Sequence, residues 1–240
     1  MAKVGQKSGP GKVLEGFLRA NLPLSGPTSV IKKLLPIQES NQTGYFYLEN
    51  RSKMISYTTS KTKDELLGIL RLQKANLPDA LTPEEIQSQG FVTVSHSYEA
   101  LKKLNDIEQH LIGKDGDNVM AYLLAMTEKS KMDIPVLIPM FETFGKILYK
   151  GIPVSEYNYI VVGQVCVAKD YRGMGILDKC YAAYQVHFTN KYDLAITEID
   201  AKNLRSLNAH KRIGFTEIHR YMTPNNIEWV IVIWDWRNVI

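Results

Sequence analysis

A glycine-containing turn between a predicted strand and a predicted helix has the residue types needed to bind an anion. The apolar run that begins at Tyr159 reaches Val167, Gly173 and Gly175 follow in the turn, and a helical pattern starts at Ile176. The first turn of a helix has N–H groups without intrahelical partners and carries partial positive charge. Glycine lets a phosphate approach the backbone, and Arg172 adds a fixed positive charge beside it. By itself the stretch indicates either a phosphate site or an ordinary glycine turn at the end of a strand.

A second patterned stretch runs from Asn203 to Phe215. Ser206, Ala209 and Ile213 follow helical spacing, and Gly214 is a natural helix stop. Asn203 is the residue expected to cap this helix. The two stretches together predict strand, glycine turn and helix, then a further strand and a second capped helix.

Together the two stretches resemble the GNAT superfamily of acyl-CoA-dependent N-acyltransferases. The first matches the family's Arg/Gln-x-x-Gly-x-Gly/Ala loop at Arg172 and Gly175, although Leu177 stands where a small residue is usual. The second matches the family's Asn-x-x-Ala/Ser helix, with His210 at the usual tyrosine position. Its matching residues are Asn203, Ser206, Arg212, Gly214 and Phe215. The resemblance covers residues 54–240.

The resemblance implies an α+β fold: a mixed, twisted, mostly antiparallel sheet with splayed central strands flanked by helices. It also implies acetyl-CoA as co-substrate, held largely by main-chain groups of the strand edge and the turn. The residues that would bind it are Val165, Cys166, Val167, Arg172, Gly173, Met174, Gly175, Ile176, Leu177 and Asn203. No metal site is expected.

The implied reaction is direct attack of a primary amine on the thioester carbonyl in a ternary complex. A base is needed because most amines are protonated at neutral pH. Glu198 occupies a position at which some family members carry that base, and Asp200 and Glu156 are weaker candidates. For the departing thiolate two alternatives stay open: His210 replaces the family's tyrosine as proton donor, or the thiolate leaves unaided.

Composition describes an ordinary globular chain. The 240 residues are 45% hydrophobic and 22% charged, and no apolar run approaches the length that crosses a bilayer. Residues 1–53 hold eight basic and three acidic residues, so the remainder has a net charge of −1 and makes no case for nucleic acid. Cys166 and Cys180 are expected to be reduced core residues of a cytoplasmic protein.

The chain is predicted to comprise a basic extension, residues 1–53, and an acyltransferase domain, residues 54–240. The extension lacks sustained periodicity and is rich in Lys, Gly and Pro, a composition that resists packing. About thirty residues, 128–157, intervene where the family usually has a short connection. We interpret them as a wall of the substrate pocket, the alternative being an added packing element or a contact in a homodimer.

Periodicity predicts the other elements. Helices are expected from Lys63, from Pro83 with a capping box of Thr82 and Glu85, and over residues 98–111. Strands are expected at residues 55–59, 91–94, 118–126 and 194–199, with a closing antiparallel pair at 216–221 and 228–236. Residues 113–117 are expected to form a charged turn, and a helix is expected to run through Leu148.

Two other functions compete with an amine acetyltransferase. One is a non-catalytic module that binds or senses acyl-CoA. The other is a nucleotide-binding protein of another fold, which is disfavoured because the sequence has neither the third glycine of a dinucleotide fingerprint nor a Gly-Lys-Ser/Thr for a P-loop.

Overall fold

The computed structural model describes residues 33–39, 42–48, 55–132 and 138–237. The chain divides into two units, Met1–Ser52 and Lys53–Ile240, and each is described by itself. Most of the predicted extension, residues 1–32, lies outside the described residues, as do residues 133–137 of the predicted insertion. No helix of the described ranges is long and apolar enough to cross a membrane.

The first unit contains an antiparallel pair of strands that the sequence analysis did not predict. Strand β1 (Lys33–Glu39) pairs with β2 (Gln42–Leu48), in a register that runs from Lys33 opposite Leu48 to Glu39 opposite Gln42. In the sequence, polar and apolar residue types alternate only weakly over these two segments, so periodicity alone gave no strand signal there.

In the second unit, seven strands of the described chain form one sheet, in the order β10-β11-β9-β8-β5-β4-β3. Every neighbouring pair is antiparallel except β8 and β9, which run parallel. The strands are β3 (Ile55–Thr59), β4 (Leu111–Asp115), β5 (Asn118–Met126), β8 (Tyr159–Val167), β9 (Leu194–Asp200), β10 (Thr216–Met222) and β11 (Glu228–Asp235). This mixed, mostly antiparallel sheet confirms the predicted fold class.

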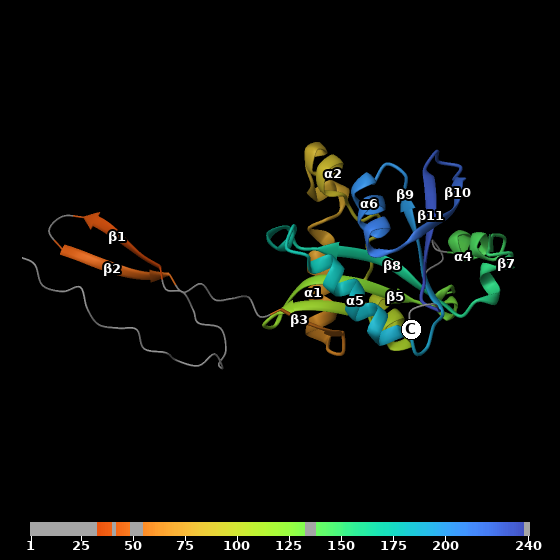
Figure 1. Ribbon diagram of the computed structural model, residues 1–240, viewed down its shortest axis with the longest axis horizontal. Helices are drawn as coiled ribbons and strands as arrows, with labels where there is room; N and C mark the ends of the chain where they lie inside the picture. Colours follow the sequence, from red (N-terminus) through yellow and green to blue (C-terminus); the bar gives the residue numbers. More distant parts are fainter. Residues whose placement is uncertain (1–32, 40–41, 49–54, 133–137, 238–240) are drawn as a thin grey trace, which may run out of the picture. The chain divides into compact units, whose positions relative to one another are not determined.

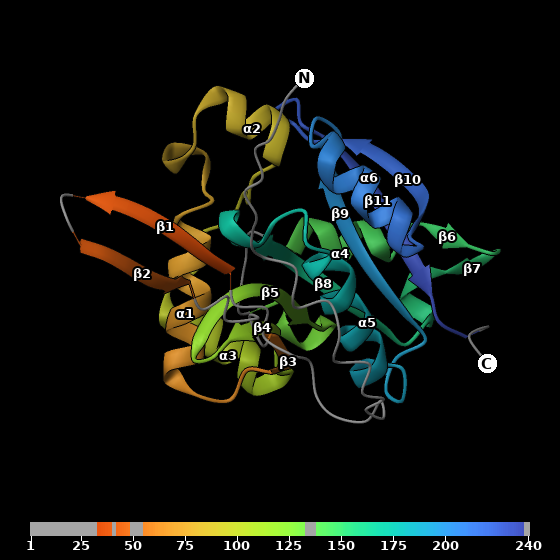
Figure 2. The same ribbon diagram turned by 60° about the vertical axis from the view of Figure 1, so that its left-hand side comes forward.

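Helices cover both faces of the sheet. Helix α5 (Ile176–Phe188) lies in front of β5 and β8 in Figure 1, whereas α1 (Lys63–Lys74) lies behind them. Figure 2 shows the same layers after a turn of 60°. The face of α1 also carries α3 (Tyr98–Ile107) and α4 (Ile138–Phe144), and α6 (Leu204–Ile213) packs into the same core cluster as α5. The short helix α2 (Pro83–Gln89) has no buried residue.

The predicted capping box of α2 is confirmed, and α1 has a second one that the sequence analysis did not predict. Thr82 and Glu85 form a reciprocal capping box at α2, and Thr62 and Glu65 form another at α1. The hydroxyl of each threonine accepts a bond from the glutamate N–H at 3.2 Å. Short-range chemistry of this kind is readable from sequence because both partners lie within one turn.

The predicted strand at residues 91–94 is wrong: this segment has no regular secondary structure. Its main-chain groups form hydrogen bonds with Asn76 and Gln164 and do not pair with a neighbouring strand of the described chain. The Val92 N–H donates to Asn76 O at 3.1 Å, and Val94 O accepts from the side-chain amide of Gln164 at 2.9 Å. The alternating apolar residues therefore belong to a loop that packs against the sheet, in which Val92 is buried.

The predicted helix over residues 98–111 ends early, at Ile107. Glu108 already has extended backbone angles, φ −147° and ψ 124°, and Leu111 begins β4. The predicted charged turn is correspondingly shorter, because Gly113 to Asp115 pair with β3 and β5. Burial of Leu111 and Ile112 in the sheet outweighs continuation of the helix.

The inserted region also differs from its prediction. Helix α4 ends at Phe144 and does not reach Leu148; instead β6 (Leu148–Tyr149) and β7 (Ile152–Pro153) form a small hairpin. Lys150 and Gly151 at its tip have φ values of 50° and 81°, the left-handed backbone that a tight hairpin turn requires. Four single turns of 3₁₀ helix occur in the described chain, at Pro78–Ala80, Glu128–Ser130, Val154–Glu156 and Lys169–Tyr171.

Candidate functional site

The centre of the sheet opens between β8 and β9. The two strands pair only at their beginnings, where Tyr159–Val161 faces Leu194–Ile196. The hydroxyl of Thr197 then donates to Val162 O at 2.7 Å, and beyond that point no pairing joins the described residues of the two strands. The arrows separate toward their C-terminal ends (Figure 2). The last residues of β8 therefore present a free strand edge to the gap.

A bulge in β8 marks the start of this opening. Leu123 of β5 pairs with Val165 and Ala125 pairs with Val162, so Gly163 and Gln164 together face a single residue of β5. A Cβ on Gly163 would lie 1.9 Å from the sulfur of Met126, so a larger residue does not fit. The bulge thus depends on glycine at this position.

The Gln164 side chain is held at the bulge by three hydrogen bonds. Its Oε1 accepts from the Gln73 amide and from the Tyr122 hydroxyl, both at 2.7 Å, and its Nε2 donates to Val94 O. These bonds join α1, β5 and the segment after α2 to the splayed part of β8. The side chain is buried, and both its oxygen and its nitrogen form hydrogen bonds, which favours one arrangement of the bulge.

The glycine turn supplies an open backbone surface at the start of α5. Gly173 and Gly175 have φ values of 73° and 70°, and a Cβ on either would meet no atom of the described structure within 4 Å. Gly175 is the N-cap of α5, and no described side chain caps this helix. Its first N–H groups are therefore available to an anion, as the sequence predicts.

The Arg172 side chain stabilises the glycine turn through two hydrogen bonds. Its Nε donates to Val167 O at 3.1 Å, and its Nη2 donates to Asn76 Oδ1 at 2.5 Å. Asn76 lies just after α1 and donates in turn to Leu72 O. The guanidinium therefore ties the glycine turn to the end of β8 and to α1, a role that the sequence motif alone did not indicate.

A cleft of about 520 Å³ connects these features. It contains most of the residues predicted to bind the cofactor, and His210. Those that line it are Val165, Cys166, Val167, Arg172, Gly173, Gly175, Ile176, Leu177, Asn203 and His210. Met174 and Glu198 are not among the lining residues, and Met174 is 50% exposed. Leu177 also packs against the core cluster of α5, so this departure from the family pattern fills core space.

One wall of the cleft was missed by sequence reasoning. It is formed by Asn76 and by residues 89–92, which follow α2. Asn203 accepts a bond from Ser206 N at 3.1 Å, as expected for the cap of α6, and its amide also donates to Phe91 O at 3.5 Å. Arg205 donates to Ser88 O at 3.2 Å. Such contacts span more than a hundred residues of sequence, and no local pattern reveals them.

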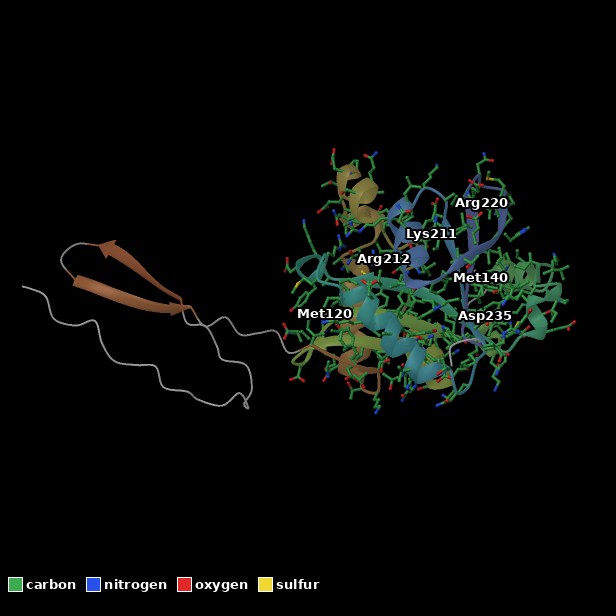
Figure 3. All side chains as sticks on the ribbon, in the orientation of Figure 1. Met120, Met140, Lys211, Arg212, Arg220 and Asp235 are labelled. Carbon is green, nitrogen blue, oxygen red and sulfur yellow. The ribbon has the colours of Figure 1, made fainter. Side chains whose placement is uncertain are left out.

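The opposite rim carries an ion pair between two helices. Arg212 makes two bonds to the Asp178 carboxylate, at 3.1 and 2.9 Å, and both residues line the cleft. Figure 3 shows Lys211 and Arg212 on α6. Exposed pairs of this kind stabilise a fold little, so the arginine remains available to an anionic ligand.

The His210 imidazole is buried and both its nitrogens are used within the protein. Nδ1 lies 2.8 Å from Ser206 O, and because a carbonyl oxygen only accepts, Nδ1 carries the proton. Nε2 then accepts from the Tyr181 hydroxyl at 2.6 Å. Burial lowers the pKa of His210 to about 4, so the ring is neutral near pH 7. This arrangement leaves no ring N–H for a departing thiolate.

Glu198 lies beside the gap on the other strand. Its neighbour Ile199 packs into the cluster of α5, and side chains alternate along a strand, so Glu198 faces the side that carries α1, α3 and α4. Burial raises the pKa of Glu198 to about 7. The Tyr221 hydroxyl donates to Glu198 Oε2 at 2.5 Å. Glu198 is therefore a carboxyl group that exchanges protons near neutral pH.

The described residues support neither a reactive cysteine nor a metal site. Burial raises the pKa of Cys166 and Cys180 to about 12, so both thiols are protonated, as expected for core residues. No group of three or more His, Cys, Asp or Glu residues within the described ranges is arranged to hold a metal ion.

The sequence matches no protein-family model and no curated protein. The structure is similar to many solved GNAT acetyltransferases. The acetyltransferase of the GNAT family from Streptococcus agalactiae 2603 matches with a TM-score of 0.54 and 8% identity, over 76% of this chain and 95% of that one. The NatC complex bound to Gag peptide and CoA contains a chain with a TM-score of 0.52 and 14% identity, over 76% and 98%.

A third structure, the N-acetyltransferase from Staphylococcus aureus Mu50, matches with a TM-score of 0.50 and 15% identity, over 75% of this chain and 98% of that one. The three agree in the same mixed sheet and flanking helices. The chain has the GNAT fold, as its two sequence motifs predict.

Proposed function

We propose that this protein is an acyl-CoA-dependent N-acyltransferase that transfers an acetyl group to a primary amine. The observation that carries the proposal is the coincidence, in one cleft, of a free strand edge on β8 and an uncapped start of α5. The edge offers main-chain groups that suit the amides of a pantetheine chain. The helix start, with two left-handed glycines, suits a pyrophosphate.

The residues present fit an acyl-CoA. Main-chain groups of Val165, Cys166 and Val167 would hold the pantetheine chain, and the N–H groups of residues 173–177 would hold the pyrophosphate. The N–H of Arg172 donates to Lys169 O at 3.3 Å, so it is not counted among them. Gly173 and Gly175 carry no side chain, so they leave that backbone surface open. One of the similar structures was solved with CoA, which supports the same ligand class here. Bound in this cleft, acyl-CoA supplies an activated thioester carbonyl.

We assign proton removal from the amine to Glu198. A carboxyl group with a pKa of about 7 is poised to accept a proton near neutral pH and still be partly ionised. As the C–N bond forms, the proton leaves the amine nitrogen for the Glu198 carboxylate, and the C–S bond breaks to release CoA thiolate. His210 has no free N–H, so in this proposal the thiolate leaves without a proton from the protein.

Binding and turnover test the proposal separately. Binding is measured by titration calorimetry with CoA and acetyl-CoA, with NAD and ATP as competing ligands. Turnover is measured as thiol release from acetyl-CoA against polyamines, amino acids, aminoglycosides and peptide N-termini. Micromolar CoA binding with thiol release for one amine class is expected. CoA binding without release from any amine would instead indicate the acyl-CoA binding module, and binding of NAD or ATP alone would contradict both.

A further inference from the structure

The contact between Glu198 and Tyr221 joins two strands that are not adjacent in the sheet. Glu198 lies on β9 and faces Ile231 of β11, and Tyr221 lies on β10, beyond β11. The tyrosine side chain therefore reaches across the intervening strand. Its hydroxyl donates to Glu198 Oε2 at 2.5 Å, and no other hydrogen bond to this carboxylate is recorded among the described residues.

The surroundings of this pair are apolar. Tyr221 and Ile218 pack against a buried cluster that includes Ile231 and Phe141, so β11 and α4 bring aliphatic and aromatic side chains to this side of the sheet. On its own strand, the ring of His219 stacks on Tyr221 with centroids 6.4 Å apart and an angle of 19°. Among the described residues, Tyr221 is the titratable group that shifts the pKa of Glu198. In turn, Glu198 is the charged group that shifts the pKa of Tyr221.

We infer that Tyr221 is a positioning residue for acyl transfer: its hydroxyl holds the Glu198 carboxylate beside the gap and stabilises the ionised form that takes the amine's proton. The inference rests on the proposed function. Tyr221 keeps its own proton throughout, because burial and the neighbouring carboxylate raise its pKa far above the usual range. The proton from the amine goes to Oε1, since Oε2 already accepts from the tyrosine.

Two opposing causes decide whether loss of the Tyr221 hydroxyl raises or lowers the pKa of Glu198. Burial raises the pKa of Glu198, and the hydrogen bond from Tyr221 lowers it, with the net value at about 7. Removing the hydroxyl leaves burial unopposed, so the pKa rises further. A smaller fraction of Glu198 is then ionised near pH 7, and the rate on the acidic side falls.

The experiment compares Tyr221→Phe with the wild-type chain over a range of pH. The acid limb of kcat/KM is expected to move up by about 0.5–1 pH unit, with a roughly three- to tenfold lower rate below neutral pH and a high-pH plateau kept within about twofold. The Glu198 carboxyl is followed independently by carbon NMR, with Glu198→Gln identifying its resonance. Its midpoint is expected to move in the same direction.

Tyr149→Phe is the matched control. Tyr149 packs against the same cluster, and its hydroxyl contacts Asp235 at 3.3 Å and not Glu198. This variant is expected to leave the acid limb in place. A uniform loss of rate at every pH in Tyr221→Phe, or an unmoved Glu198 midpoint in the NMR titration, would overturn the inference. Absence of turnover in the wild-type chain would instead overturn the proposed function, and the NMR midpoints remain measurable in that case.

Discussion

The two sides of the gap between β8 and β9 differ in whether main-chain or side-chain groups line them. On the β8 side, the cleft is formed largely by main chain: a strand edge, a glycine turn and a helix start. On the β9 side, the proposed chemistry depends on one buried carboxyl group and the tyrosine that contacts it. A main-chain site tolerates changes such as Leu177, whereas a side-chain site depends on the identity and environment of each residue.

On the β8 side, the largest effect on CoA binding is expected at a residue whose backbone is left-handed. Gly175→Val is expected to lower CoA affinity by about 100-fold or more, because it strains a left-handed residue and covers the N–H groups proposed to bind phosphate. Titration calorimetry measures the loss. Gly116→Val is the matched control, since Gly116 has a φ of 59° and open space around it in the turn between β4 and β5. Unchanged affinity in Gly175→Val would refute the phosphate assignment.

The β9 side is most sensitive at Glu198. Glu198→Gln is expected to lower turnover by about 100-fold near neutral pH, where the amine substrate is protonated and needs a base. The loss narrows as the pH approaches the pKa of the amine, because free amine then attacks unaided. CoA affinity stays unchanged, which separates the two sides of the gap. A parallel pH profile in variant and wild type would remove Glu198 as the base.

Glu198 also predicts a pH dependence of stability. Its pKa in the folded chain, about 7, lies above the ordinary value of 4.5. The folded state thus binds the proton more tightly, and this contribution is full below about pH 4.5 and is lost as the pH rises through 7. Glu198→Gln avoids that loss and should be more stable than wild type at pH 8, by about 1–3 kcal/mol. Denaturant unfolding measures it, and equal stability of the two chains is expected near pH 4.5.

The smallest effect is expected at the buried His210 pair. Tyr181→Phe leaves Nε2 of His210 without a donor and should cost about 1–2 kcal/mol of stability, while turnover stays within about twofold. Thermal unfolding and steady-state kinetics measure the two. Tyr184→Phe is the control, because Tyr184 is equally buried on α5 and its hydroxyl makes only a 3.5 Å contact. A large loss of turnover in Tyr181→Phe without a loss of stability would assign the pair to proton transfer.

Local signals in the sequence determined the framework. Apolar runs predicted β5, β8, β9 and the closing pair. Capping residues predicted the starts of α2 and α6, and the two motifs predicted the GNAT fold. These features involve residues within a few positions of one another, so periodicity and caps reveal them. The same local signals failed at residues 91–94 and 108–111, where burial against distant strands decided the conformation.

Only the tertiary structure decided which residues meet. Arg172 contacts Asn76, Tyr181 contacts His210 and Tyr221 contacts Glu198, pairs separated by 96, 29 and 23 positions. The protonation of Glu198 and His210 also depends on how deeply the fold buries them, since removing water from a charged group is what moves its pKa. The sequence by itself determined the strand, the glycine turn and the helices, and with them the proposed class of ligand. Long-range packing decided the hydrogen-bond partners and the burial on which the proposed proton transfer depends.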